Sequence, residues 1–129
     1  MKNEKNKSIG NLIIEKSYNF ALRIVKLYKY LSENKKEFVI AKQVLRCGTS
    51  IGANIYEAQS AETKKDFIHK MGIALKEAKE TIYWLNLLKD SDYIDVKSYN
   101  SITLNCDEII KLISKIISTS KKNITNEVK

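Results

Sequence analysis

Residues 63–89 read TKKDFIHKMGIALKEAKETIYWLNLLK, and this stretch decides the fold. Its apolar side chains recur at steps of three or four residues, which is the spacing of one face of an α-helix. The stripe consists of Phe67, Met71, Ala74, Leu75, Ala78, Ile82, Leu85 and Leu88. Thr63 followed by Asp66 resembles a capping box, with aspartate in place of the usual glutamate or glutamine. The pattern therefore predicts a long amphipathic helix that begins after Thr63 and ends at about Lys89.

Three other segments show the same helical period. They span about 8–31, 37–58 and 96–118. Polar residues interrupt the pattern between these segments, and Asp95 stands where an N-cap is expected before the last one. The chain has no proline, so none of these helices is forced to end early.

Short loops between long helices make neighbouring helices run antiparallel. The sequence therefore predicts an all-α, antiparallel up-down-up-down four-helix bundle over residues 8–118. The polar stretches 1–7 and 119–129 are expected to be frayed tails.

The segment 63–89 is apolar over more than one face. Ile68, Ile73, Tyr83, Trp84 and Leu87 lie off its main stripe. One chain cannot bury all of these side chains, so we expect the protein to self-associate. On this view Tyr83 and Trp84 lie between subunits.

Gly48 and Gly52 lie four residues apart on one side of the predicted helix 37–58. Each glycine costs about 1 kcal/mol of helix propensity relative to alanine. Close approach of another helix would compensate for this cost, and the small side chains of Ala41 and Ala53 favour that interpretation. A bend in the helix is the alternative.

The net charge is +8, with an excess near the N-terminus. In residues 8–32, Lys16, Arg23, Lys26 and Lys29 oppose a single carboxylate, Glu15, for a net +3. A localised basic excess is typical of proteins with polyanionic partners, although it also occurs on surfaces that are merely solvated.

Enzyme, metal and membrane functions find no support in the sequence. Cys47 and Cys106 lack partners at metal-ligand spacing and are expected to be reduced thiols in the core. His69 is the only histidine, and it has no activated nucleophile beside it. Residues 1–7 are too polar for a signal peptide, and no apolar run is long enough to span a membrane. We expect a cytoplasmic protein without catalytic activity, cofactor or metal.

A basic ridge follows the predicted helix 8–31. The side chains of Lys16, Asn19, Arg23, Lys26 and Tyr30 fall within about 80° of arc. Such a ridge can follow a phosphate backbone, and a tyrosine can stack on a base. The predicted nucleic-acid-binding residues are Lys16, Arg23, Lys26, Lys29 and Tyr30.

A polar line formed by Arg46, Ser50, Asn54 and Glu57 crosses the predicted helix 37–58. Arg46 and Glu57 are about 16 Å apart along the helix axis, so each needs a partner elsewhere. Glu80 is the expected partner of Arg46. We interpret the line as a structural hydrogen-bond network or subunit interface that sets helix register, in preference to a ligand site.

Residues 46–58, RCGTSIGANIYEA, resemble the signature of the four-helix bundle proteins known as 23S rRNA intervening sequence proteins. The blocks 65–67 and 73–75, with Glu80 beyond them, match the third helix of the same family. The resemblance covers about residues 9–118. Three positions depart from the family pattern, which often has arginine, proline and glycine where this chain has Leu45, Gly52 and Ala58.

The resemblance implies an up-down four-helix bundle that assembles into a ring-like homopentamer, with no enzymatic activity. Many family members are encoded within sequences inserted in bacterial 23S rRNA genes. A related branch comprises accessory proteins of diversity-generating retroelements, which bind nucleic acid and a reverse transcriptase through a basic bundle surface.

These observations favour a non-enzymatic, homo-oligomeric protein that binds RNA or DNA through its basic surface. The alternative is a protein–protein scaffold that docks an acidic partner or a reverse transcriptase. A weaker third interpretation places a small molecule in the bundle or ring core, beside the polar line of helix 37–58.

Overall fold

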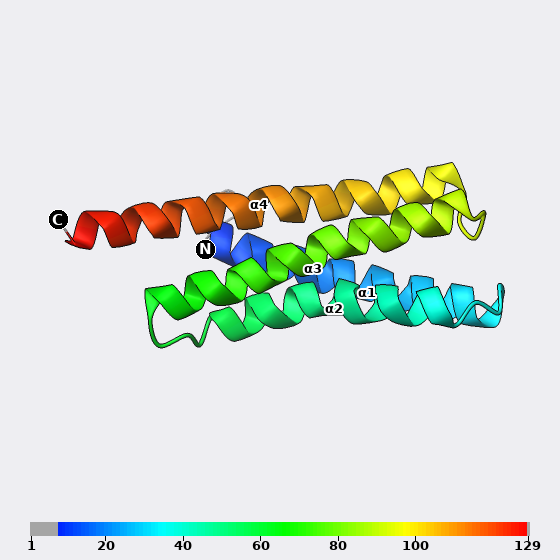
Figure 1. Cartoon of the computed structure of the whole chain (residues 1–129), viewed down its shortest axis with the longest axis horizontal. Helices are drawn as coiled ribbons and strands as arrows, with labels where there is room; N and C mark the ends of the chain where they lie inside the picture. The colour runs from blue at the N-terminus through cyan, green and yellow to red at the C-terminus, as the bar shows by residue number, and fades with distance from the viewer. Residues whose placement is uncertain (1–7, 129) are drawn as a thin grey trace, which may run out of the picture.

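The computed structural model describes residues 8–128 of the chain. Its four helices are α1 (Ile9–Glu33), α2 (Val39–Ala58), α3 (Lys64–Asp90) and α4 (Val96–Val128). Consecutive helices run antiparallel (Figure 1), and each helix packs against two others: α1 against α2 and α4, and α3 against α2 and α4. The predicted antiparallel four-helix bundle is confirmed. The pairing of α1 with α4 is the least extensive of the four.

Two helix starts follow the predicted capping residues. The Thr63 hydroxyl accepts the N–H of Asp66 at 3.0 Å, so the threonine half of the capping box forms. The Asp95 carboxylate accepts the N–H of Ser98 at 2.7 Å. Each side chain satisfies an N–H group that the helix itself leaves without a partner.

The start of α2 differs from the prediction. The helix begins at Val39, whereas the periodicity suggested Glu37. Glu37 lies outside the helix, and its carboxylate accepts the N–H of Ala41 at 2.9 Å. Glu37 therefore does not belong to α2, but its side chain satisfies an N–H group in the first turn of that helix.

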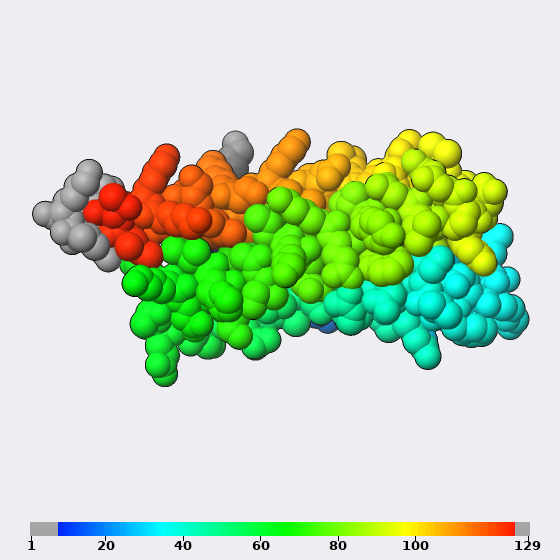
Figure 2. Space-filling model, in the orientation of Figure 1, coloured from blue at the N-terminus to red at the C-terminus, as the bar shows by residue number. Residues whose placement is uncertain are grey.

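The end of α4 also differs. The predicted end near Ser118 is wrong, because the helix continues to Val128. No proline occurs in the chain and no glycine follows Gly72, so nothing in the covalent structure stops the helix. The last turns of α4 extend past the α2–α3 connection (Figures 1 and 2). Of the predicted frayed tails, residues 1–7 and Lys129 lie outside the described residues.

The core lies along the bundle axis and receives side chains from all four helices. Its largest fully buried members include Phe20, Ile24, Leu31, Ile51, Ile55, Met71, Leu85, Leu88, Ile109 and Ile113. Met71, Leu85 and Leu88 belong to the apolar stripe that the sequence analysis identified in residues 63–89, so that stripe is confirmed.

The two glycines of α2 face α1. A Cβ atom at Gly48 would lie 2.7 Å from Cγ1 of Ile24, and one at Gly52 would lie 3.3 Å from the backbone oxygen of Ser17. A side chain at Gly48 would overlap Ile24, and one at Gly52 would lie tightly against the backbone of α1, because α1 approaches so closely. The predicted close approach of a second helix is therefore confirmed.

Both cysteines are free and buried. The Cys47 sulfur lies 3.2 Å from the Thr81 hydroxyl, and the Cys106 thiol donates to the Ala78 carbonyl at 3.4 Å. Burial raises the pKa of the Cys47 thiol, and burial raises that of Cys106 to about 12. Two protonated thiols in the core match the expectation from the sequence.

Candidate nucleic-acid interface

Lys16 and Arg23, the first two cations of the predicted ridge, reach across to α4. The Lys16 ammonium pairs with the Glu108 carboxylate at 3.0 Å. The Arg23 guanidinium donates to the side-chain oxygen of Asn105 at 2.5 Å and to the backbone and hydroxyl oxygens of Ser101 at 3.3 and 3.1 Å. These contacts tie α1 to α4, the pair of neighbouring helices that packs least extensively.

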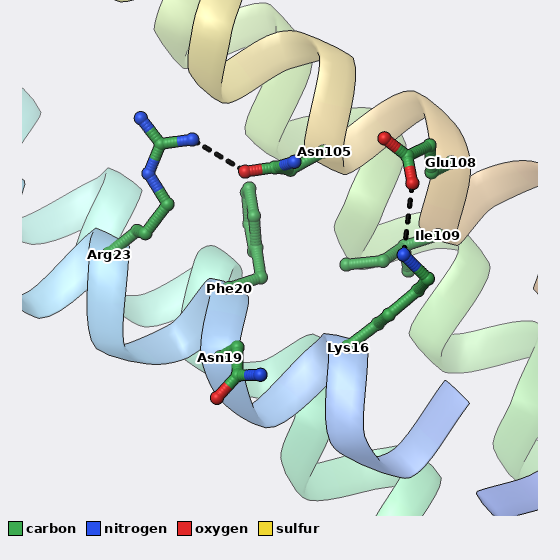
Figure 3. A pocket seen from close by; sticks show the side chains of 7 residues that line it. All are labelled: Lys16, Asn19, Phe20, Arg23, Asn105, Glu108 and Ile109. Carbon is green, nitrogen blue, oxygen red and sulfur yellow. Dashed lines mark hydrogen bonds and ion pairs between the residues drawn. The ribbon is translucent and has the colours of Figure 1, made fainter. Parts of the chain in front are cut away.

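Figure 3 shows the hollow that these contacts border. It has a volume of about 240 Å³, and Phe20 and Ile109 form its apolar part between the Lys16–Glu108 pair and the Arg23–Asn105 pair. Because Glu108 neutralises Lys16, this end of the ridge is less attractive to a polyanion than the sequence suggests. Arg23 keeps its full charge, since its partners on α4 are neutral.

The other end of the ridge is open. Lys26, Lys29 and Tyr30 are exposed on the last turns of α1. Within residues 8–125, whose side chains are described, no carboxylate lies within ion-pair distance of Lys26 or Lys29. The Lys35 ammonium lies 6.0 Å from the centre of the Tyr30 ring. The ridge thus divides into a clamped part, Lys16 and Arg23, and an open part, Lys26, Lys29 and Tyr30.

The predicted partnership of Arg46 with Glu80 is present. Arg46 of α2 forms ion pairs with Glu80 and, at 3.2 Å, with Glu77 of α3. The indole N–H of Trp84 donates to the same Glu80 carboxylate at 3.0 Å. The hydrogen bond from Trp84, together with the charge of Arg46, lowers the pKa of Glu80. These four residues, here called the Arg46 cluster, connect α2 to α3.

The remaining members of the polar line do not join the Arg46 cluster through their side chains. The Ser50 hydroxyl donates to the Arg46 carbonyl at 2.6 Å, and the Asn54 amide donates to the Ser50 carbonyl at 2.8 Å. Glu57 pairs with Lys70 of α3 at 3.5 Å. The line therefore bonds partly to its own helix and partly to α3, and the described residues do not form one continuous network along it.

A second surface lies on the outer side of α1 and α2. It is an apolar groove of about 440 Å³ whose lining includes Ile14, Ala21 and Ala53, with Tyr18 and Tyr56 exposed by 65% and 74%. On α3, Tyr83 is 60% exposed, whereas Trp84 packs against the core of its own chain. Apolar surface is therefore exposed in the α1–α2 groove and, on α3, at Tyr83.

Among the described residues, no group of three or more His, Cys, Asp and Glu side chains is arranged to hold a metal ion. No helix in this part of the chain has the length and apolar character needed to cross a membrane.

A family model described as 23S rRNA-intervening sequence protein matches residues 11–115. The chain belongs to this family. The match confirms the resemblance carried by residues 46–58, and it spans α1, α2 and α3 and most of α4. Membership accounts for the four-helix fold.

A solved structure supports the same placement. It is a Bacteroides thetaiotaomicron protein, described as having unknown function and as belonging to the S23 ribosomal protein family. The two chains are 53% identical, and the match covers 86% of this chain and 99% of that one with a TM-score of 0.86. No curated protein matches this chain. The family model and this structure therefore agree on the family of the chain, and neither names a biochemical activity.

Sequence reasoning missed the α4 side of the interface. Glu108, Asn105 and Ser101 hold the clamped cations, and none of them belongs to a motif. The available signal was their spacing. Residues 101, 105 and 108 are four and three residues apart, so their side chains share one face of α4. Only the register between α1 and α4 shows which cations they meet.

Proposed function

We propose that this protein is a non-enzymatic nucleic-acid-binding protein that acts as a homo-oligomer, with a pentamer as the expected form. One observation carries the proposal: Lys26 and Lys29 stand exposed on α1 beside the exposed ring of Tyr30, without carboxylate partners among the described residues. Cations in this state attract phosphates, and a neighbouring aromatic ring adds contact with a base.

Self-association would multiply this weak site. At +8 per chain, five chains carry +40. Several copies of one site on a ring bind a long polyanion far more tightly than one copy does. The exposed tyrosines of the α1–α2 groove and of α3 supply apolar surface for such contacts.

The test is fluorescence anisotropy with labelled RNA and DNA across a salt series. The Lys26→Ala/Lys29→Ala variant should bind about tenfold or more weakly, with a shallower dependence on salt, because counterion release scales with the number of phosphates neutralised. The matched control is Lys65→Ala/Lys79→Ala, which removes the same charge from exposed positions on α3, a helix that does not pack against α1.

Equal losses in the two double variants would show that only net charge matters and would remove α1 as the interface. No binding to any nucleic acid at low salt would reject the proposal. That outcome favours the alternative, a protein–protein scaffold whose basic surface docks an acidic protein or a reverse transcriptase.

A further inference from the structure

A groove of about 450 Å³ separates the last turns of α1 from the first turns of α4. In the described part of the chain its lining consists of Arg23, Lys26, Leu27, Tyr30, Ser98 and Ile102, none of them acidic. The groove therefore combines two cations, one aromatic ring, a hydroxyl and two aliphatic side chains.

The two cations of this lining differ in how they are held. Arg23 is fixed by its bonds to Ser101 and Asn105, so its charge has a set position. Lys26 is exposed and can adjust its position. A fixed guanidinium beside a flexible ammonium suits a phosphate group, which accepts hydrogen bonds from several directions.

Three further residues give the lining apolar surface. Leu27 is half-buried, Ile102 is buried, and the Tyr30 ring is 42% exposed. The Lys35 ammonium lies 6.0 Å from the centre of this ring and adds a positive charge beside it. An exposed ring beside aliphatic side chains offers a flat planar group a surface on which to stack.

We infer that this groove receives an unpaired nucleotide of a single-stranded RNA or DNA, with the base against Tyr30 and Leu27 and a phosphate at Arg23 and Lys26. The inference rests on the proposed function and narrows its ligand to single strands. A duplex presents its phosphates but keeps the faces of its bases stacked, so it can use the cations and not the apolar part of the groove.

The experiment compares three polyanions: a labelled single-stranded oligonucleotide, a duplex of the same sequence, and inorganic polyphosphate, which has no bases. Tyr30→Ala should weaken binding of the single strand by roughly 5- to 150-fold, the range for loss of one base–aromatic stack. Binding of duplex and polyphosphate should change less than about twofold. Tyr30→Phe keeps the ring and should keep the affinity, whereas Lys26→Ala should weaken binding of all three polyanions.

Photo-crosslinking gives a second readout that folding defects do not imitate. A single strand that contains 5-iodouracil, irradiated with the unmodified protein, should yield a crosslinked peptide that includes Tyr30. The inference is overturned if Tyr30→Ala loses affinity for all three polyanions or for none of them. The proposed function still stands in either case, provided that the unmodified protein binds nucleic acid. If none of the three binds the unmodified protein, the proposed function fails, and the groove assignment fails with it.

Discussion

Gly48 is the residue at which α1 and α2 come closest. A Cβ atom there would lie 2.7 to 3.0 Å from three side-chain atoms of the buried Ile24. Gly48→Ala should therefore destabilise the protein by about 1–3 kcal/mol, the usual range for overpacking a core. Gly72 of α3 is the matched control, because a Cβ there meets nothing within 4 Å. Gly72→Ala should stabilise the protein by about 0.5–1 kcal/mol through helix propensity alone.

Denaturant unfolding followed by circular dichroism measures both changes. If Gly48→Ala proves as stable as the unmodified protein, Ile24 can move aside without cost and α2 does not require a glycine at this point.

The two thiols give a prediction about reactivity and pH. Burial raises the pKa of Cys47, and burial raises that of Cys106 to about 12, so neither forms the reactive thiolate near neutral pH. We expect no reaction with a thiol reagent such as DTNB in the native protein and reaction of both thiols after unfolding. Unfolded thiols ionise near pH 8.5, so the native state should lose stability as the pH rises above that value toward 12. Rapid labelling of either thiol in the native protein at pH 7 contradicts this expectation.

At the residue scale, the sequence predicted most of what depends on local chemistry. Between helices it predicted the pairing of Arg46 with Glu80 but missed the contacts of Lys16 and Arg23 with α4. The close approach of α1 at Gly48 follows from local chemistry and periodicity, and so do the caps Thr63 and Asp95 and the two buried thiols. The pairing of Lys16 with Glu108 does not, because helix period says which residues share a face and not how far one helix slides along another.

At the scale of helix pairs, α2 and α3 are joined by the Arg46 cluster. The folded state lowers the pKa of Glu80, first through the hydrogen bond from Trp84 and then through Arg46. A carboxyl group with a lowered pKa adds stability above its unfolded pKa of about 4.3, and this stability is lost as the pH falls through the folded value. The stability of the bundle should therefore fall on acidification below about pH 4.3.

Glu80→Gln isolates the charge, because glutamine can still accept the hydrogen bond from Trp84. The cost at pH 7 should be no more than about 1 kcal/mol, since the side chains of Arg46 and Glu80 are 49% and 35% exposed. At pH 3 the difference between the variant and the unmodified protein should be smaller than at pH 7, because protonation of Glu80 removes the ion pair. Thermal unfolding at both pH values, followed through Trp84 fluorescence, measures this. A difference of the same size at both pH values would show that packing, and not the ion pair, is what the substitution disturbs.

Helix ends illustrate the limit of periodicity at this scale. The apolar stripe of α4 stops near Ser118, yet the helix continues to Val128 because nothing in the covalent structure ends it. The start of α2 shows the opposite error. The periodicity extends the helix to Glu37, yet Glu37 lies before the helix and accepts the N–H of Ala41. A stripe marks where a helix packs, while caps, prolines and glycines mark where it ends.

At the scale of the whole molecule, antiparallel neighbours and short loops were enough to predict the bundle, and the order of the helices places α4 beside α1. The nucleotide-sized groove between them was beyond sequence reasoning, because Ser98 and Ile102 reach it from a distant part of the chain. Tyr18 and Tyr56 escaped notice for the same reason, since each lies off the apolar stripe of its own helix and only their proximity forms an apolar surface.

Self-association is the prediction that belongs to the whole molecule. The α1–α2 groove faces away from α4, so a neighbouring chain can occupy it while Lys26, Lys29 and Tyr30 remain free. Tyr18→Glu/Tyr56→Glu places two charges in this groove and should reduce the oligomer to monomers, because an unpaired charge in an apolar contact is costly to bury. Leu104→Glu, at a 61% exposed position on α4 outside the groove, is the matched control and should leave the mass unchanged. Native mass spectrometry reports the number of chains directly.

If the monomeric variant keeps its fold but binds a long oligonucleotide at least tenfold more weakly while binding a short one equally well, the loss lies in the number of sites joined together and not in any one of them. A monomeric unmodified protein contradicts the pentamer, and each chain would then have to bind its ligand alone.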